Sequence, residues 1–377
     1  MPIKTEEEKL ARIRLNFTSC MRSDWILKLM ELYGGAGALL QRGAGEIAAD
    51  GGISFETAER FTREMRGADP LGELEAARKA GVRILTEQEE GYPELLRKIP
   101  DPPLAIYVRG ELPPEIPAVA VVGTRKFTDY GARSATRFAR ELARAGLAVV
   151  SGLARGVDTA AHEAAVKAGG KTWAVLGTGL NVCYPPENRK LAEKIVSSGG
   201  ALVSEFPMDS GPRPTNFPRR NRVISGLSYA VLVVEGDYSS GALITARAAL
   251  EQGREVLALP GPVDSAMSRG PNMLLKNGAA LAESALDIIA ALPAEALFGL
   301  KTSGLAEKGD KPEARLKGLS PDAVAAYRAI RESREGQGVD GLAEKLGWPV
   351  QRIAAALFEL EAASLITPCA DKYKPAL

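Results

Sequence analysis

Glycines and arginines follow directly after several short apolar runs of this chain, and these are residues that could do chemistry. The stretch SGLARGVDTAAH, residues 151–162, combines two glycines with an arginine in this way. GTRK at 123–126 repeats the pattern, and RRNR at 219–222 holds three arginines. Glycine lets a backbone approach a ligand closely, and a guanidinium group binds two phosphate oxygens at once. These residue types therefore predict a site for several phosphates in a row.

The predicted binding residues lie in the turns and helix starts that follow such runs. They are Gly123, Thr124, Arg125, Ser151, Gly152, Arg155, Gly156, Gly177, Asn188, Arg189, Phe217, Arg219, Arg220, Asn221, Arg222, Ser240, Gly241 and Thr245. Arg125 comes in a turn too short to reach the outer surface of a helix, so we expect it to face the binding crevice. By contrast, Arg133, Arg137, Arg140 and Arg144 follow helical spacing, which favours a solvated surface.

Aromatic residues occur among the same donors. They are Phe127, Tyr130, Tyr184, Phe217 and Tyr238. Rings beside a cationic groove are typical of single-strand binding, because unpaired bases stack on them while the phosphates meet the cations. Phe217, between Asn216 and Pro218, is the strongest candidate for such a platform, and ordinary packing remains open for the other rings.

The elements that must position these residues are apolar runs followed by turns and helical periods. The runs are AVAVVG (118–123), LAVVS (147–151), TWAVLG (172–177), ALVSE (201–205), YAVLVVE (229–235) and EVLALP (255–260). Continuous apolar runs indicate strands buried on both faces, which predicts a doubly wound α/β fold with a mostly parallel sheet. In such a sheet, ligands bind beyond the carboxyl ends of the strands, so the loops above should meet there.

We expect five segments along the chain. Residues 1–85 show helical spacing and predict a small helical domain, and 86–117 is a proline-rich connector around one short strand, LAIYVRG. The sheet domain spans 118–292, and 293–318 reads as a linker. Residues 319–377 predict three helices and a hairpin, the pattern of a winged helix. This segment is nearly neutral, so docking to a protein is as reasonable an interpretation as binding to duplex DNA.

Composition sets limits on the partners. The formal net charge is +1, so any basic site must be local. Three scattered cysteines (Cys20, Cys183 and Cys369) argue against a disulfide framework and favour a reducing, cytoplasmic location. The N-terminus lacks the apolar core of a signal peptide, and no stretch predicts a membrane span.

Other site types fit less well. The first turn lacks a dinucleotide fingerprint, no nucleoside-triphosphate loop occurs, and a single histidine leaves too few ligands for a transition metal. We therefore expect neither cofactor nor metal.

Ser151, Asp158 and His162 are residue types of a hydrolase triad, but the Gly-x-Ser-x-Gly elbow is absent. A nucleotide hydrolase acting on nucleoside monophosphates stays open as an alternative, with Glu205 or Glu235 as its carboxylate. A third reading is a winged-helix regulator that senses a nucleotide.

Several of these motifs, in order and spacing, resemble the DNA-processing protein A (DprA, also called Smf) family. They include GTRKFTDYG, SGLARGVDTAAH, AVLGTGLNVCYPPEN, FPRRNRVISGLS and SRGPNMLLKNGA. The resemblance covers about residues 91–290. The C-terminal segment is similar to the winged helix of many members, and the N-terminal segment is only loosely similar to their helical domain.

The resemblance implies a non-catalytic, Rossmann-like protein of the cytoplasm. It implies binding and protection of single-stranded DNA, a homodimer through that domain, and loading of a RecA-type recombinase during natural transformation. It also assigns Arg125, Arg219, Arg220 and Arg222 to the DNA pocket. The position after Tyr-Pro, often basic in the family, is Pro186 here, which leaves one cation missing or replaced by Arg189.

Overall fold

The structure is a computed structural model that describes residues 6–301, 316, 319–333, 336–363, 365–369 and 372–375. The chain divides into two compact units, Met1–Ser303 and Gly304–Leu377. Each unit has its own buried core, so each is described by itself.

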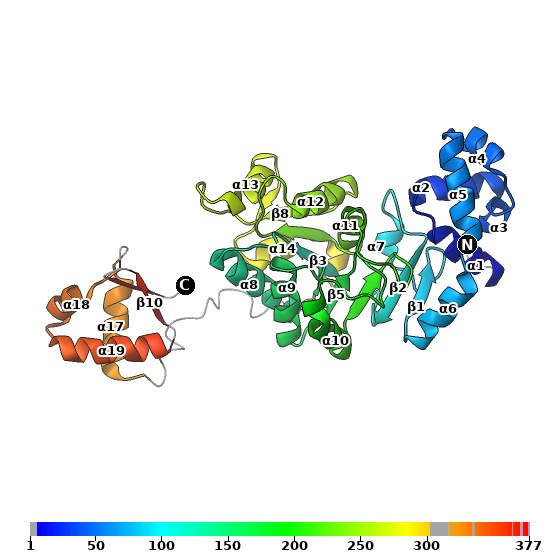
Figure 1. The fold of residues 1–377 in the computed structure, drawn as a ribbon. Coiled ribbons are helices and arrows are strands. Elements are labelled where there is room, and N and C mark those ends of the chain that lie inside the picture. The colour runs from blue at the N-terminus through cyan, green and yellow to red at the C-terminus, as the bar shows by residue number, and fades with distance from the viewer. Residues whose placement is uncertain are drawn as a thin grey trace. The chain divides into compact units, whose positions relative to one another are not determined.

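A nine-stranded sheet forms the centre of the first unit (Figure 1). Its order is β1 (Arg83–Thr86), β2 (Ala105–Gly110), β6 (Ala201–Ser204), β5 (Thr172–Val175), β4 (Ala148–Ser151), β3 (Ala118–Val122), β7 (Ala230–Val233), β8 (Glu255–Ala258) and β9 (Ala280–Leu281). β1–β2 and β2–β6 pair antiparallel, and the other neighbours pair parallel. The strand order reverses direction at β3, which places the loop after β3 at the switch point where such sheets bind ligands.

Helices cover both faces of this sheet, as the apolar strands require. One face packs against α7 (Glu94–Arg97), α11 (Asn216–Gly226), α12 (Gly241–Glu251) and α13 (Arg269–Lys276). The remaining helices of this part are α8 (Asp129–Ala145), α9 (Val157–Lys167), α10 (Arg189–Ser197), α14 (Ala285–Ala290) and α15 (Ala294–Leu297), with short 3₁₀ turns at Pro186–Asn188 and Ala266–Ser268. The α/β class and the mostly parallel sheet predicted from the sequence are confirmed.

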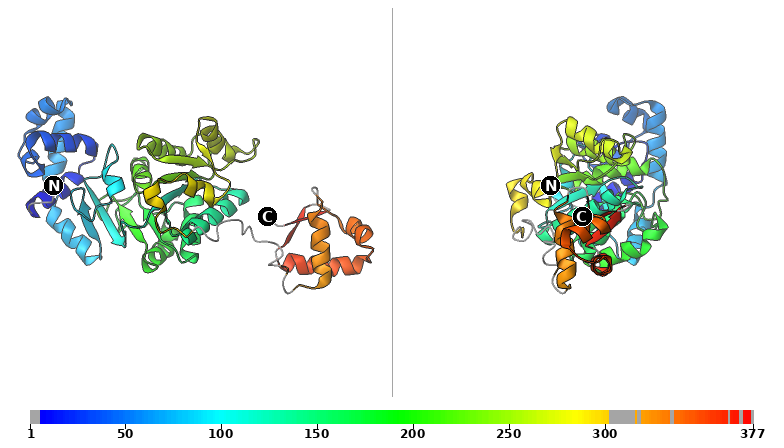
Figure 2. Two further views of the ribbon diagram at one scale, coloured as in Figure 1. Left: turned by 180° about the vertical axis from the view of Figure 1, so that it is seen from behind. Right: turned by 90° about the vertical axis from the view of Figure 1, so that its left-hand side faces the viewer.

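The N-terminal helices pack on one another and on the β1–β2 edge of the sheet (Figure 2). They are α1 (Glu6–Asn16), α2 (Ser23–Tyr33), α3 (Ala36–Leu39), α4 (Ala44–Gly51), α5 (Phe55–Gly67) and α6 (Pro70–Lys79). Ile13 of α1 and Ala77 of α6 share a core with Ile84 and Tyr107 of the strands. The expected boundaries at 85 and 117 therefore do not bound the sheet, because β1 and β2 extend it into both earlier segments.

The second unit contains α17 (Pro321–Arg331), α18 (Val339–Leu346), α19 (Val350–Ala362) and an antiparallel pair, β10 (Ile366–Cys369) with β11 (Lys372–Pro375). Tyr327, Ile330, Leu342, Ile353 and Leu357 fill its core. Of the expected linker 293–318, residues 293–301 and 316 are described, and 302–315 and 317–318 lie outside the described residues.

The described residues contain neither a membrane-spanning helix nor a metal-ligand cluster. Within those ranges, no helix is long and apolar enough to cross a membrane. Across the same residues, no group of three histidine, cysteine or acidic side chains is placed to hold a metal ion.

Candidate functional site

The loops after β3 and β4 touch through their backbones at the carboxyl ends of the strands. The Val157 N–H donates to the Thr124 carbonyl at 3.2 Å. Gly156 adopts φ +79°, and a Cβ at this position would lie 2.3 Å from the Thr124 oxygen, so only glycine fits. This contact brings the arginines of the two loops, Arg125 and Arg155, to one edge of the sheet.

A small pocket forms where these loops meet the start of α11. Arg125, Gly152, Ala154, Arg155, Tyr184, Pro185, Phe217 and Arg220 line it, and we call it the Phe217 pocket. The Arg125 guanidinium carbon lies 5.5 Å from the centroid of the Phe217 ring. The Tyr184 ring centroid is also 5.5 Å from that of Phe217, with the two planes inclined by 44°. A cation and two rings therefore share one surface, which suits a base and its phosphate.

Arg220 forms the buried floor of the Phe217 pocket, since only 5% of the residue is exposed. Its Nη1 donates to the Gly152 carbonyl at 2.7 Å and also to the Val175 carbonyl. The Asp158 carboxylate accepts the Gly152 and Ala154 N–H groups at 3.1 and 3.2 Å. Burial lowers the pKa of Arg220 to about 10 and raises the pKa of Asp158. Arg220 thus holds the ends of β4 and β5 rather than presenting a free cation.

The backbone of residues 152–155, which passes next to Arg220, is strained at Leu153. Leu153 is fully buried and has φ +55°, a conformation that costs a non-glycine residue roughly 1–3 kcal/mol. The Asn188 Nδ2 fixes it by donating to the Leu153 carbonyl at 2.9 Å and to Thr159 Oγ1 at 2.8 Å. Arg155 is exposed beyond this turn and forms an ion pair with Glu187. The predicted residue Asn188 therefore supports the loop from below.

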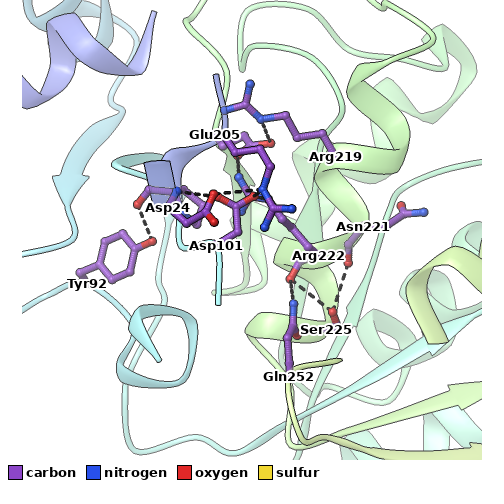
Figure 3. Close-up of polar contacts among 11 residues, drawn as sticks. Asp24, Tyr92, Asp101, Glu205, Arg219, Asn221, Arg222, Ser225 and Gln252 are labelled. Carbon is purple, nitrogen blue, oxygen red and sulfur yellow. Dashed lines mark hydrogen bonds and ion pairs between the residues drawn. The ribbon is translucent and has the colours of Figure 1, made fainter. Parts of the chain in front are cut away.

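Arg219 and Arg222 lie in a different environment (Figure 3). Glu205, whose side chain is 1% exposed, pairs with Arg219 Nε at 3.1 Å and with Arg222 Nη2 at 2.5 Å. Arg222 Nε also lies 3.1 Å from Asp101. Both arginines line a cavity of about 450 Å³ with Asp101, which we call the Asp101 pocket. Their charges are largely balanced by carboxylates.

The expectation that all three arginines of RRNR join Arg125 in one trough is therefore wrong in part. Helical spacing explains the division, because residues three apart share a face of α11. Phe217 and Arg220 are such a pair and line the Phe217 pocket, whereas Arg219 and Arg222 are another and line the Asp101 pocket. Arg22 and Arg247 also line the Asp101 pocket, and sequence reasoning selected neither for the site.

Most of the remaining predicted residues hold the loops together. Ser151 is buried and donates to the Val121 carbonyl at 2.7 Å, and the Thr124 N–H donates to the Glu235 carbonyl at 2.7 Å. A Cβ at Gly123 would lie 2.5 Å from Val157, and one at Gly177 would lie 2.7 Å from the Phe217 ring. These two glycines are thus required by close packing.

The predicted residues around α12 form a local hydrogen-bonded group. Asn221 Nδ2 donates to the Gly241 carbonyl at 3.2 Å, and Thr245 Oγ1 donates to the same carbonyl at 3.5 Å. Ser240 accepts the Ala242 N–H as the cap of α12. Arg189 is exposed at the start of α10. Ala154, Tyr184 and Pro185 also line the Phe217 pocket but were not predicted as site residues. The aromatic ring of Tyr184 and the Tyr-Pro motif are the signals in the sequence that could have identified them.

His162 and Glu235, the residues named in the two alternative enzyme hypotheses, both make structural contacts. His162 is buried and its Nδ1 donates to Thr172 Oγ1 at 2.7 Å, because the Thr172 hydroxyl itself donates to the Val149 carbonyl. Burial lowers the pKa of His162 to about 3, so the ring is neutral at ordinary pH. Glu235 accepts the Thr128 N–H and hydroxyl at 2.9 and 2.6 Å, which fixes the start of α8.

Comparisons with known proteins agree on the relationship of this chain. The family model described as DNA recombination-mediator protein A matches residues 83–293. Protein Smf of Escherichia coli is 43% identical over 296 residues, which cover 77% of this chain and 76% of that protein.

Two solved structures are also similar. The X-ray structure of DNA processing protein A from Streptococcus pneumoniae has a TM-score of 0.63 and 33% identity, and the match covers 78% of this chain and 99% of that one. DNA processing protein A from Helicobacter pylori, solved to explain its single-stranded DNA binding mode, has a TM-score of 0.50 and 32% identity over 55% of this chain and 94% of that one. The chain therefore belongs to the DNA recombination-mediator protein A family, also known as DprA or Smf.

Proposed function

We propose that this chain is a non-catalytic single-stranded DNA-binding protein that mediates recombination. The observation that carries the proposal is the Arg125 guanidinium over the Phe217 ring, with the Tyr184 ring beside Phe217 in the same pocket. Family membership supports it, as does the DNA-binding mode reported for the Helicobacter pylori relative.

The binding step follows from the chemistry of this pocket. An unpaired base stacks on Phe217 or Tyr184, while Arg125 and the neighbouring Lys126 bind phosphates. Arg155 binds a further phosphate by exchanging its exposed partner Glu187 for it, because an exposed ion pair is weak. Gly152 and Gly156 let the loop after β4 pack closely on Arg220 and on the Thr124 carbonyl, which fixes the shape of the pocket. A duplex hides the faces of its bases, so the same pocket discriminates against it.

The finer steps rest on the family relationship. We infer that bound strands are protected in the cytoplasm and then passed to a RecA-type recombinase during natural transformation, and that two chains pair through their Rossmann-like domains. The three helices and the hairpin of the second unit support the winged-helix interpretation. A strand-exchange assay tests the loading step, with a RecA-type recombinase and a competing protein that covers single-stranded DNA. If the inference is right, adding this protein makes strand exchange faster.

Fluorescence anisotropy with oligo-dT, its duplex and a mononucleotide as parallel ligands tests the proposal. We expect tight binding for oligo-dT alone. A strand that contacts about three cations at the Phe217 pocket should give a slope of log affinity against log salt of about −2. Equal affinity for the duplex, or affinity independent of salt, contradicts the proposal. Release of free base from nucleoside monophosphates would instead support the hydrolase alternative, although Glu205 and Glu235 are both engaged in structural contacts.

A further inference from the structure

The exposed side of α19 carries an apolar stripe. Val350 is 49% exposed and Phe358 is 74% exposed, and Ala354 and Ala362 are exposed as well. These four residues are spaced by four, so they lie on one side of the helix. Among the described residues of the second unit, none covers Phe358. The opposite side of α19 packs into the core through Ile353, Leu357 and other residues.

The one basic residue of α19 is already engaged. Arg352 Nε and Nη2 donate to the Asp322 carboxylate at 2.7 and 2.6 Å. Its guanidinium carbon also lies 4.1 Å from the centroid of the Trp348 ring. The exposed stripe therefore offers no cation to a phosphate, and binding to duplex DNA through this helix would lack its main source of affinity.

Large and small side chains alternate along the stripe, so that the stripe is complementary to a second copy of itself. In an antiparallel pair centred on residue 356, Phe358 of one copy meets Ala354 of the other, and Val350 meets Ala362. A large side chain then opposes a small one at every level, as packed helices require. Gln351 and Glu361 of the two copies also come to the same level, where an amide can donate to a carboxylate.

The parallel arrangement has none of these features. It would place Phe358 against Phe358 and Ala354 against Ala354, leaving a clash next to a void. It would also place Glu361 against Glu361, a repulsive pair of like charges. We therefore propose that the second unit self-associates through α19, antiparallel, with a second copy of this chain as the occupant of the stripe.

The expected strength follows from the length of the contact. The thirteen residues of α19 span about 20 Å, and a single helix pair of this length buries less than the ~1,000 Å² of a stable interface. Association through α19 alone should be weak. It gains strength wherever two chains are held together by another contact, because the second contact then forms at a high effective concentration. The proposal does not depend on the DNA-binding function.

Site-directed cross-linking of the full chain tests the geometry. Gln351→Cys and Glu361→Cys chains are mixed and treated with a short thiol-specific cross-linker, and joined peptides are identified by mass spectrometry so that the native cysteines cause no ambiguity. In the antiparallel pair residue 351 faces residue 361, whereas the two copies of residue 351 lie about 15 Å apart along the helix. We expect the mixture to cross-link and each variant alone to remain at the background set by Glu344→Cys, an exposed site on α18. Self-linking of Gln351→Cys, or no linking above background, overturns the proposal.

A size swap tests the packing. Phe358→Ala should abolish most of the 351–361 cross-link, and Ala354→Phe should do the same by opposing two large rings. The double variant restores a large side chain against a small one and should recover the yield. All these positions are exposed, so the substitutions leave the fold of the unit intact. A double variant no better than either single change would contradict the antiparallel register.

Discussion

Arginines lie on both sides of the first turns of α11, but in opposite settings. On the Phe217 side, Arg125 is exposed and lies over an aromatic ring, with no carboxylate bound to it among the described contacts. On the Asp101 side, Arg219 and Arg222 share the buried Glu205 carboxylate. The difference shows that the number of arginines in a motif does not measure its capacity for phosphate. What decides is whether a buried carboxylate already neutralises them, as Glu205 does, whereas an exposed pair such as Arg155 with Glu187 is easily exchanged for a phosphate.

The same comparison separates Arg220 from Arg125 within the Phe217 pocket. Arg220 is buried against carbonyl groups and Asp158, so its role is to fix the loops. Arg125 is free to meet a ligand. Substitutions on the two sides of α11 should therefore divide into those that change stability and those that change binding.

Arg220→Met should have the largest effect, on stability. It removes the positive charge that most favours the buried Asp158 carboxylate and leaves the Gly152 and Val175 carbonyls without their donor, which together typically costs about 3–5 kcal/mol. Urea unfolding followed by circular dichroism measures the loss of unfolding free energy. The double variant with Asp158→Asn should recover part of it. A loss below about 1 kcal/mol would show that the pair does not hold the floor of the pocket.

Acid should destabilise the sheet domain through His162, which is buried between α9 and β5. The folded-state pKa, about 3, lies below the ordinary value of 6.5, so the unfolded chain takes up a proton first as pH falls. Stability from this group is present above pH 6.5 and is lost progressively toward pH 3, by about 2–3 kcal/mol at pH 4.5. Unfolding titrations at several pH values, compared with His162→Asn, isolate the histidine. Identical pH profiles for the two proteins would count against a neutral, buried ring.

Phe217→Ala should weaken oligo-dT binding by about 1–3 kcal/mol, the usual contribution of one stacked base. The ring is partly exposed, so the thermal midpoint should change little. Anisotropy titration at fixed salt measures the effect. Phe55→Ala, which removes an exposed ring on α5 that lines neither pocket, is the matched control and should bind normally.

Arg222→Ala should reverse this pattern on the Asp101 side. Glu205 keeps Arg219 as a partner, so the loss of unfolding free energy is about 1–2 kcal/mol. The affinity for oligo-dT should stay within about twofold, because this arginine is already paired. A large loss of affinity with unchanged stability would place the strand on the Asp101 side instead.

The sequence predicts the parts of the site that depend on local order. Arg125 follows β3 within a few residues, so the parallel-sheet pattern alone places it at the carboxyl edge. The buried apolar runs likewise predict β3 to β8. β1 was missed because RILT holds only two apolar residues between Arg83 and Thr86. It is an edge strand with alternating burial, so no continuous apolar run marks it.

The predictions that were wrong concern residues whose positions depend on contacts between distant segments of the chain. Helical spacing alone could have separated Phe217 and Arg220 from Arg219 and Arg222. It could not reveal that Glu205 and Asp101 meet the second pair, since these come from the end of β6 and from the connector. The burial of Arg220 also requires the positions of Gly152 and Val175, which no local pattern supplies.

The central claim is that single-stranded DNA is held on the Phe217 side of α11, and two matched arginines test it directly. Arg125 and Arg247 are both exposed, and each lines one of the two pockets. Oligo-dT affinity is measured by anisotropy for Arg125→Ala and Arg247→Ala at the same salt concentration. The account predicts a loss of about 1.5–3 kcal/mol for Arg125→Ala and a change within about twofold for Arg247→Ala. The reverse order, or two equal losses, would contradict it.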